Sequence, residues 1–175
     1  MDSHNHNQCI TKCLQDAHHI AVQAGKKLTP QRLQVLQILL NDHRAVGAYD
    51  ILAIMQRKPL EDRTKPQPPT VYRALEFLLE LGLIHKVESQ NSYYACTIDK
   101  PENRQHVAQA FICNLCGIVE EKAALAGAQG LYKKADGFGF KIDRVIMECR
   151  GTCAVCQTEQ RQTGQRANTA TGVNI

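Results

Sequence analysis

The chain has 175 residues, a mass of 19.5 kDa and a formal net charge of +4, with 43% hydrophobic and 22% charged residues. This composition is ordinary for a globular protein and excludes wholesale disorder, and the lack of a long apolar run excludes a membrane span. The N-terminus is polar and lacks the apolar core of a secretory signal, so a cytoplasmic location is expected. In that reducing compartment, the eight cysteines are expected to be metal ligands or redox groups rather than structural disulfides.

Helical patterns dominate the first half of the chain. A weak amphipathic pattern predicts a helix over 8–23. The hydroxyl of Thr29, placed before a proline, predicts the start of a second helix over 30–41. A shorter helix is predicted over 48–56, and the stretch 57–69, which contains four prolines, is predicted to be a loop.

The clearest helix follows this loop. Its apolar spacing predicts a helix over 70–81, with Thr70 as the N-cap and Gly82 as the stop. Two short strands over 83–88 and 92–97 are then joined by a tight hairpin. This order is typical of a winged helix-turn-helix, in which the second helix enters the DNA major groove and the wing touches the backbone. The alternative is an ordinary helical bundle with a solvated charged face.

The polar side of this helix carries candidate DNA contacts. Tyr72 and Arg73 lie opposite the apolar stripe, and an arginine can hydrogen-bond guanine through two donors. Lys65, Lys86 and Arg57 are placed to meet phosphates. The candidate DNA-binding residues from this region are Lys65, Thr70, Tyr72 and Arg73.

The second half alternates between strand and helix patterns. Strands are predicted over 107–113, around 118–119 and over 138–147, with a helix over 122–135. The predicted fold class is therefore α+β, with a winged helix-turn-helix domain followed by a small α/β domain. The predicted boundaries are a DNA-binding domain over 1–97, a hinge over 98–106, an α/β domain over 107–157 and a disordered polar tail over 158–175.

Two Cys-x-x-Cys pairs are the strongest chemical signal. Cys113 and Cys116 precede Gly117, and Cys153 and Cys156 follow much later in the chain. Cysteines at this spacing present both sulfurs to one tetrahedral ion, and two such pairs make a closed, structural zinc site. The alternatives are two dithiols or disulfides, or a thioredoxin-like redox motif. The redox motif would have to open a helix directly after a strand, and neither pair has that setting clearly.

A looser set consists of His85, Cys96, His106 and Glu121, which lie in the predicted wing, the hinge region and the base of the second domain. Imidazole, thiolate and carboxylate together suit Zn²⁺. Spacing alone leaves ordinary alternatives, namely a partly buried wing histidine, a small core cysteine and a solvated surface acid.

Six ordered motifs carry a resemblance to a known family. They occupy residues 28–32, 48–50, 69–75, 85–89, 111–117 and 151–156. Across roughly residues 28–156 the chain resembles the ferric uptake regulator superfamily and, within it, the zinc-responsive branch. The resemblance implies a C-terminal dimerisation domain and a homodimer that binds double-stranded operator DNA. It also implies repression of zinc-uptake genes with Zn²⁺ as the co-repressor that orders the dimer.

The resemblance also implies roles for individual residues. It implies two zinc ions per chain, one structural and one regulatory. The structural ligands are Cys113, Cys116, Cys153 and Cys156, and the regulatory ligands are His85, Cys96, His106 and Glu121. Glu120 is an alternative to Glu121 as the acidic ligand, and Tyr49 and Arg73 match residues that contact operator DNA.

Two departures from the family pattern bear on specificity. The His-His-Asp-His cluster of iron and peroxide sensors is absent, and Cys96 supplies a soft ligand that favours zinc. Many relatives carry Glu-x-His-Gly before the last cysteine pair, whereas this chain has Glu148, Cys149, Arg150 and Gly151, so a histidine is missing and a thiol is added.

Other functions remain as alternatives. They are an iron- or peroxide-responsive regulator of the same superfamily, a dithiol oxidoreductase, and a zinc-stapled module that binds protein. No carboxylate pair, Ser-His-Asp set or phosphate loop is evident in the sequence, so neither an enzyme nor a small organic substrate is expected.

Overall fold

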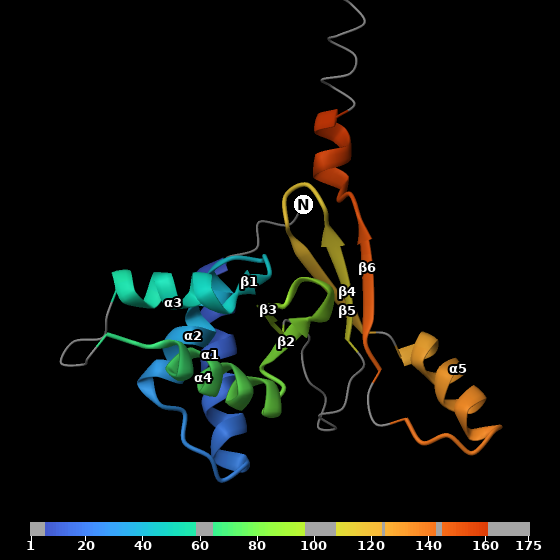
Figure 1. The fold of residues 1–175 in the computed structure, drawn as a ribbon, viewed down its shortest axis with the longest axis horizontal. Helices are drawn as coiled ribbons and strands as arrows, with labels where there is room; N and C mark the ends of the chain where they lie inside the picture. Colours follow the sequence, from blue (N-terminus) through green and yellow to red (C-terminus); the bar gives the residue numbers. More distant parts are fainter. Residues whose placement is uncertain (1–5, 59–64, 97–107, 124, 143–144, 161–175) are drawn as a thin grey trace, which may run out of the picture.

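The computed structural model describes residues 6–58, 65–96, 108–123, 125–142 and 145–160. A helical unit with a small sheet is followed by a second, three-stranded sheet with one labelled helix beside it (Figure 1). Within these ranges, no helix has the length and apolar character needed to cross a bilayer.

Within the described residues, the first unit has four helices. They are α1 (His6–Gln23), α2 (Pro30–Asn41), α3 (Ala48–Arg57) and α4 (Pro68–Glu80). The predicted start of α2 is confirmed, since Thr29 is the N-cap and its Oγ1 accepts a hydrogen bond from the N–H of Arg32 at 3.5 Å.

Helix α4 begins earlier than predicted. Its N-cap is Gln67, and Pro68 and Pro69 occupy the first turn, where a helix needs no intrahelical N–H donor and the fixed φ of proline fits. The prediction of Thr70 as the N-cap is wrong, because Thr70 lies inside the helix and its N–H donates to the Gln67 carbonyl at 2.9 Å. The predicted stop is confirmed, since Gly82 adopts a φ of 62°.

The wing is a three-stranded antiparallel sheet of order β1-β3-β2. Its strands are β1 (Val46–Gly47), β2 (Ile84–Val87) and β3 (Ser92–Ala95). The short helical turn η1 (Glu88–Gln90) and Asn91, with a φ of 48°, join β2 to β3. β1 was not predicted, because two residues carry no periodic pattern.

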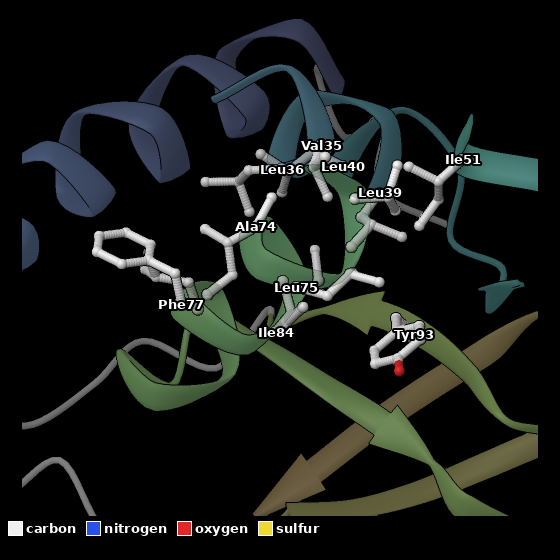
Figure 2. Close-up of a cluster of buried hydrophobic side chains, with 14 of the residues drawn as sticks. Val35, Leu36, Leu39, Leu40, Ile51, Ala74, Leu75, Phe77, Ile84 and Tyr93 are labelled. Carbon is white, nitrogen blue, oxygen red and sulfur yellow. The ribbon is translucent and has the colours of Figure 1, made fainter. Parts of the chain in front are cut away.

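The first unit has a continuous apolar core. Figure 2 shows Val35, Leu36 and Leu39 of α2 facing Ala74 and Leu75 of α4. The largest fully buried residues include Leu39, Ile51, Met55, Leu75 and Leu78. Burial of each such side chain stabilises the fold by about 1.5–3 kcal/mol. This core fixes α4 against α2 and α3 and leaves the opposite side of α4 in solvent.

The second sheet has the order β5-β4-β6. Its strands are β4 (Ala108–Cys113), β5 (Val119–Ala123) and β6 (Met147–Gly151). β4 is antiparallel to β5 and parallel to β6. In Figure 1 this sheet stands between the helical unit and helix α5 (Leu125–Asp136).

Two predicted elements of the second unit have different bounds. The helix predicted over 122–135 starts at Leu125, because β5 continues through Ala123. The strand predicted over 138–147 is wrong, since β6 starts only at Met147. Gly139 has a φ of 72° and its N–H closes a turn onto Asp136, so the first residues of the predicted strand lie in the turn after α5.

The predicted hinge and tail are only partly covered by the described residues. The predicted hinge at 98–106 and the part of the predicted tail at 161–175 lie outside the described residues. Residues 154–160 are helical, so the disorder predicted from residue 158 is wrong for 158–160. The N–H of Gln157 donates to the Cys153 carbonyl at 3.0 Å, which starts this helix at the last cysteine pair. That pair therefore opens a helix soon after β6, and the expectation that neither pair has this setting is wrong.

The two units touch through backbone and side chains. The N–H of Val119 donates to the His43 carbonyl at 2.7 Å, and Arg44 forms an isolated bridge with Ile118. A small apolar cluster draws residues from both units, namely Val87, Tyr94, Ala110, Ile112 and Val119. These contacts place β5 against the wing, which determines the composition of one of the two sites described next.

Candidate metal centres and DNA-binding face

The four cysteines of the two Cys-x-x-Cys pairs converge at one end of the second sheet. Cys113 ends β4 and pairs in parallel register with Gly151 at the end of β6, so the turns that follow these strands lie side by side. The sulfurs of Cys113, Cys116, Cys153 and Cys156 all lie within 4.8 Å of one another. Tertiary structure thus assembles the predicted set of four thiols.

The spacing of these sulfurs fits a tetrahedral metal ion. Cys116 Sγ and Cys153 Sγ are 3.8 Å apart. Zn–S bonds of about 2.3 Å in a tetrahedron give an S···S edge of about 3.8 Å, whereas a disulfide needs about 2.05 Å. None of the four is in a disulfide. The donor set and its geometry therefore suit a closed Cys₄ zinc site.

Hydrogen bonds and burial shift the pKa values of two of the thiols. The N–H of Cys153 donates to Cys113 Sγ at 3.4 Å, and Gly117, with a φ of 73°, closes the turn after the first pair. Hydrogen bonds from the backbone of Cys116 and Cys153 lower the pKa of Cys113 to about 6. A hydrogen bond with Cys153, followed by burial, raises the pKa of Cys156 to about 12. A bound cation would favour the thiolate form of all four cysteines.

The second cluster spans the two units. His85 lies in β2, Cys96 directly follows β3, and Glu121 lies in β5. Their ligand atoms lie within 4.8 Å of one another, and His85 Nε2 is 2.8 Å from Glu121 Oε1. His106, the fourth predicted member, lies outside the described residues. Three of the four predicted side chains are therefore brought together from distant parts of the chain.

The acid in this cluster is Glu121. Its side chain is 1% exposed, whereas that of Glu120 is 60% exposed and lies 3.9 Å from Lys122. A carboxylate this deeply buried requires a positive or hydrogen-bonded partner, since burial of an uncompensated charge is costly. The neighbouring imidazole and thiolate complete a donor set that suits Zn²⁺.

Tyr94 is a neighbour of the site that the sequence did not indicate. Its ring centroid lies 5.4 Å from that of His85, at a tilt of 38°. Burial and then the charge of Glu121 raise the Tyr94 pKa, so the phenol stays neutral beside the site. The pairing of His85 with Tyr94 across β2 and β3 follows from the strand register. Only that register, and no residue pattern, would have identified Tyr94.

The predicted DNA-binding residues lie on and before the helices of the first unit. Tyr72 and Arg73 are exposed on α4, on the side opposite its buried residues, and Tyr49 is 71% exposed in the first turn of α3. Lys65 is exposed ahead of α4, and Thr70 is half-buried in its first turn. The exposed side chains of Tyr72 and Arg73 therefore give α4 a polar face outside the apolar core.

The basic residues predicted to meet phosphates differ in their settings. Arg57 is exposed at the end of α3. Lys86 forms an ion pair with Glu88 at 2.5 Å, so its charge is already partly neutralised within the wing.

The fold agrees with the comparisons to known proteins. The model of the ferric uptake regulator family matches residues 23–150. This chain belongs to that family. It is 41% identical over 144 residues to the zinc uptake regulation protein of Escherichia coli (strain K12), an alignment that covers 82% of this chain and 80% of the relative.

Two solved structures are similar along most of the chain. A zinc uptake regulator complexed with zinc and DNA has a TM-score of 0.78 and 38% identity, covering 87% of this chain and 97% of the other. The crystal structure of holo XcZur has a TM-score of 0.72 and 32% identity, covering 83% and 96%. The predicted family and the predicted α+β fold class are thereby confirmed.

Proposed function

We propose that this protein is a zinc-responsive, DNA-binding repressor of zinc-uptake genes that acts as a homodimer. Its similarity to a zinc uptake regulation protein, and to a regulator solved with zinc and DNA, supports this function. The single observation that carries the mechanism is the 2.8 Å approach of His85, on the wing, to Glu121, on the second sheet. Metal occupancy there would bear directly on how the two units are oriented.

The mixed cluster is proposed as the regulatory site. His85 and Cys96 belong to the wing, Glu121 belongs to the second sheet, and His106 is proposed as the fourth ligand. Bound Zn²⁺ would supply the positive charge that holds these donors together. The residues then favour one orientation of the DNA-binding unit, which is a population shift toward the competent state. Occupancy at 100 times the dissociation constant stabilises that state by about 2.7 kcal/mol per site.

The four cysteines are proposed as a second, structural zinc site, which gives two ions per chain. Closed thiolate sites in small zinc domains bind with about 10–16 kcal/mol. A site that tight stays filled and holds together the ends of β4 and β6. Sensing therefore falls to the mixed cluster. The alternative of a dithiol oxidoreductase is disfavoured because all four sulfurs, from both pairs, lie within 4.8 Å of one another, an arrangement that suits one tetrahedral ion.

Helix α4 is proposed to read the operator. Arg73 and Tyr72 would meet base edges, Tyr49 and Thr70 would add contacts, and Lys65 would meet phosphate. One winged helix covers little DNA, so two half-sites and a homodimer are proposed. We also propose that the protein works in the cytoplasm, where thiol ligands stay reduced, and that it is not an enzyme.

Metal content and DNA binding on the same samples test the function. The DNA probe is a duplex selected from a random-sequence pool by the zinc-loaded protein. We expect two zinc ions per chain before mild chelation and one after it, with loss of specific binding on removal of the first ion. Equal binding by chelated and loaded protein would refute the proposal.

A competition experiment addresses the iron- or peroxide-responsive alternative. The thiol of Cys96 is a soft ligand and favours Zn²⁺ over Fe²⁺ or Mn²⁺. We expect Zn²⁺ to restore DNA binding to the chelated dimer at a lower free concentration than either of those ions. The opposite order would assign the protein to an iron- or manganese-dependent branch.

A further inference from the structure

The second sheet presents two carboxylates in one row toward the wing. Ala110 of β4 pairs with Glu121 of β5 on one side and with Glu148 of β6 on the other. Side chains of directly paired residues point to the same face of a sheet. Val87 and Tyr94 of the wing pack with Ala110, so this is the face that the wing covers. Glu121 contributes to the mixed cluster, whereas Glu148 is not part of it.

Glu148 reaches the turn at the tip of the wing. Its Oε1 accepts the N–H of Glu88 at 2.6 Å, and its Oε2 accepts the N–H of Ser89 at 3.4 Å. Repulsion from the Glu88 carboxylate is reduced, because Lys86 pairs with it at 2.5 Å. Bonds of this kind are stronger than those between neutral groups. Burial opposes ionisation of Glu148, but the hydrogen bonds from Ser89 and Glu88 and the charge of Arg150 outweigh it and lower its pKa.

We propose that Glu148 is a positioning residue that anchors the tip of the wing to the second sheet, so that metal binding at His85 sets the orientation of the wing. The inference rests on the proposed function of the mixed cluster. His85 and Glu88 are three residues apart, which is about 10 Å along a strand. The wing also packs on the second sheet through Val87 and Tyr94. Apolar packing is non-directional, whereas a ligand at His85 together with hydrogen bonds at the wing tip gives the strand a defined direction. Zinc binding at His85 therefore has its full effect on the orientation of the wing only while Glu148 holds the wing tip.

A purely structural role would have a different signature. It would lower the stability of the fold and weaken DNA binding equally with and without zinc. An anchor that works together with the mixed cluster instead reduces the gain in DNA affinity that zinc produces. The ratio of the two affinities is therefore the decisive quantity, and amide exchange at residues 88 and 89 reports on the anchor without any DNA.

The test uses the full-length protein and four matched variants. Glu148→Ala removes both acceptors, and Glu148→Gln keeps one acceptor without the charge. Glu120→Ala and Glu120→Gln are the controls, since Glu120 lies one position along β5 from Glu121 with its side chain 60% exposed. Two quantities are measured for each protein. The first is the hydrogen-exchange rate of the Glu88 and Ser89 amides, and the second is the affinity for the selected duplex with the mixed site loaded and empty.

We expect Glu148→Ala to speed exchange of both amides and to reduce the zinc-dependent gain in affinity about tenfold, equivalent to about 1.4 kcal/mol. Glu148→Gln should be intermediate, and it carries the comparison if the alanine variant does not fold. Both Glu120 variants should match the wild type. Unchanged exchange at residues 88 and 89, or an unchanged zinc-dependent gain, overturns the proposal. If wild-type DNA binding itself ignores zinc, the proposed function fails instead, which is a separate result.

Discussion

Replacement of Cys96 by serine is the sharpest test of the proposed regulatory site. The change removes the thiolate from a cluster in which His85 and Glu121 remain 2.8 Å apart. His85 still lies beside the buried Glu121 carboxylate, so the fold is expected to persist. The Cys₄ site at the far end of the second sheet is untouched. We therefore expect a folded dimer that keeps the Cys₄ zinc, binds zinc more weakly in the mixed cluster and shows little DNA-binding response to zinc.

The size of this effect follows from linkage. At free zinc of 100 times the wild-type dissociation constant, occupancy stabilises the bound state by about 2.7 kcal/mol per site. Removal of a residue that only hydrogen-bonds to a metal ligand weakens metal binding by about 10–100-fold. Removal of the ligand itself is therefore taken to weaken binding by about 100-fold. At the same zinc concentration only about 0.4 kcal/mol remains per site. Two sites then lose about 4.6 kcal/mol, which caps the loss of operator affinity at roughly 2,000-fold.

The expected loss is smaller than this cap. Allosteric couplings are typically about 1–3 kcal/mol, which corresponds to about 5–150-fold. The assay is a titration of the selected duplex at fixed free zinc, with metal content measured on the same sample. Cys149→Ser is the matched control, since it makes the same replacement of sulfur by oxygen. The Cys149 thiol lies outside both clusters and accepts a hydrogen bond from Gln109 at 3.4 Å. A full zinc response in Cys96→Ser would falsify the regulatory assignment.

Four further predictions address other parts of the molecule. Cys113→Ser should destabilise the second unit and the dimer together, as measured by size-exclusion chromatography and thermal melting, because it opens the closed thiolate site. Arg73→Ala should weaken specific DNA binding by about 1–3 kcal/mol in a gel-shift titration while zinc content is unchanged. Leu78→Ala should lower the free energy of unfolding by about 2–5 kcal/mol in a denaturant titration, since Leu78 is fully buried in the first core. The carboxyl of Glu148, followed by NMR, should titrate below its ordinary pKa of 4.5. Because that pKa is lowered in the folded state, the contribution of Glu148 is complete at neutral pH and is lost as the pH falls through the lowered value.

Each of these predictions has a result that contradicts it. A Cys113→Ser protein that melts like the wild type would mean that the four thiols do not stabilise the second unit. Equal loss of specific and nonspecific binding in Arg73→Ala would make that residue a phosphate contact. A change below about 1 kcal/mol for Leu78→Ala would place it at the edge of the core. A Glu148 midpoint at or above 4.5 would contradict the hydrogen bonds to the wing.

Local chemistry made some features of this protein predictable. Thr29 and the proline after it specify the start of α2, because a cap and a fixed φ act within one turn. The pairs Cys113–Cys116 and Cys153–Cys156 indicate metal ligands by their spacing alone. Where local signals conflict, prediction fails. A strand is predicted over 138–147, but the left-handed Gly139 forms a turn at its start.

Tertiary structure decided the features that depend on distant residues. The choice between Glu120 and Glu121 depends on which side of β5 faces the wing, because neighbouring residues in a strand point to opposite faces. The contact of Glu148 with the wing turn joins residues about 60 positions apart through the parallel pairing of β6 with β4. No periodicity in the chain carries that information. The amino-acid sequence by itself therefore determined the family, the presence of the helices and the residue types of the two proposed metal sites. Only the packing of two sheets determined which acids face the wing, because that depends on strand register and on the contact between the two units.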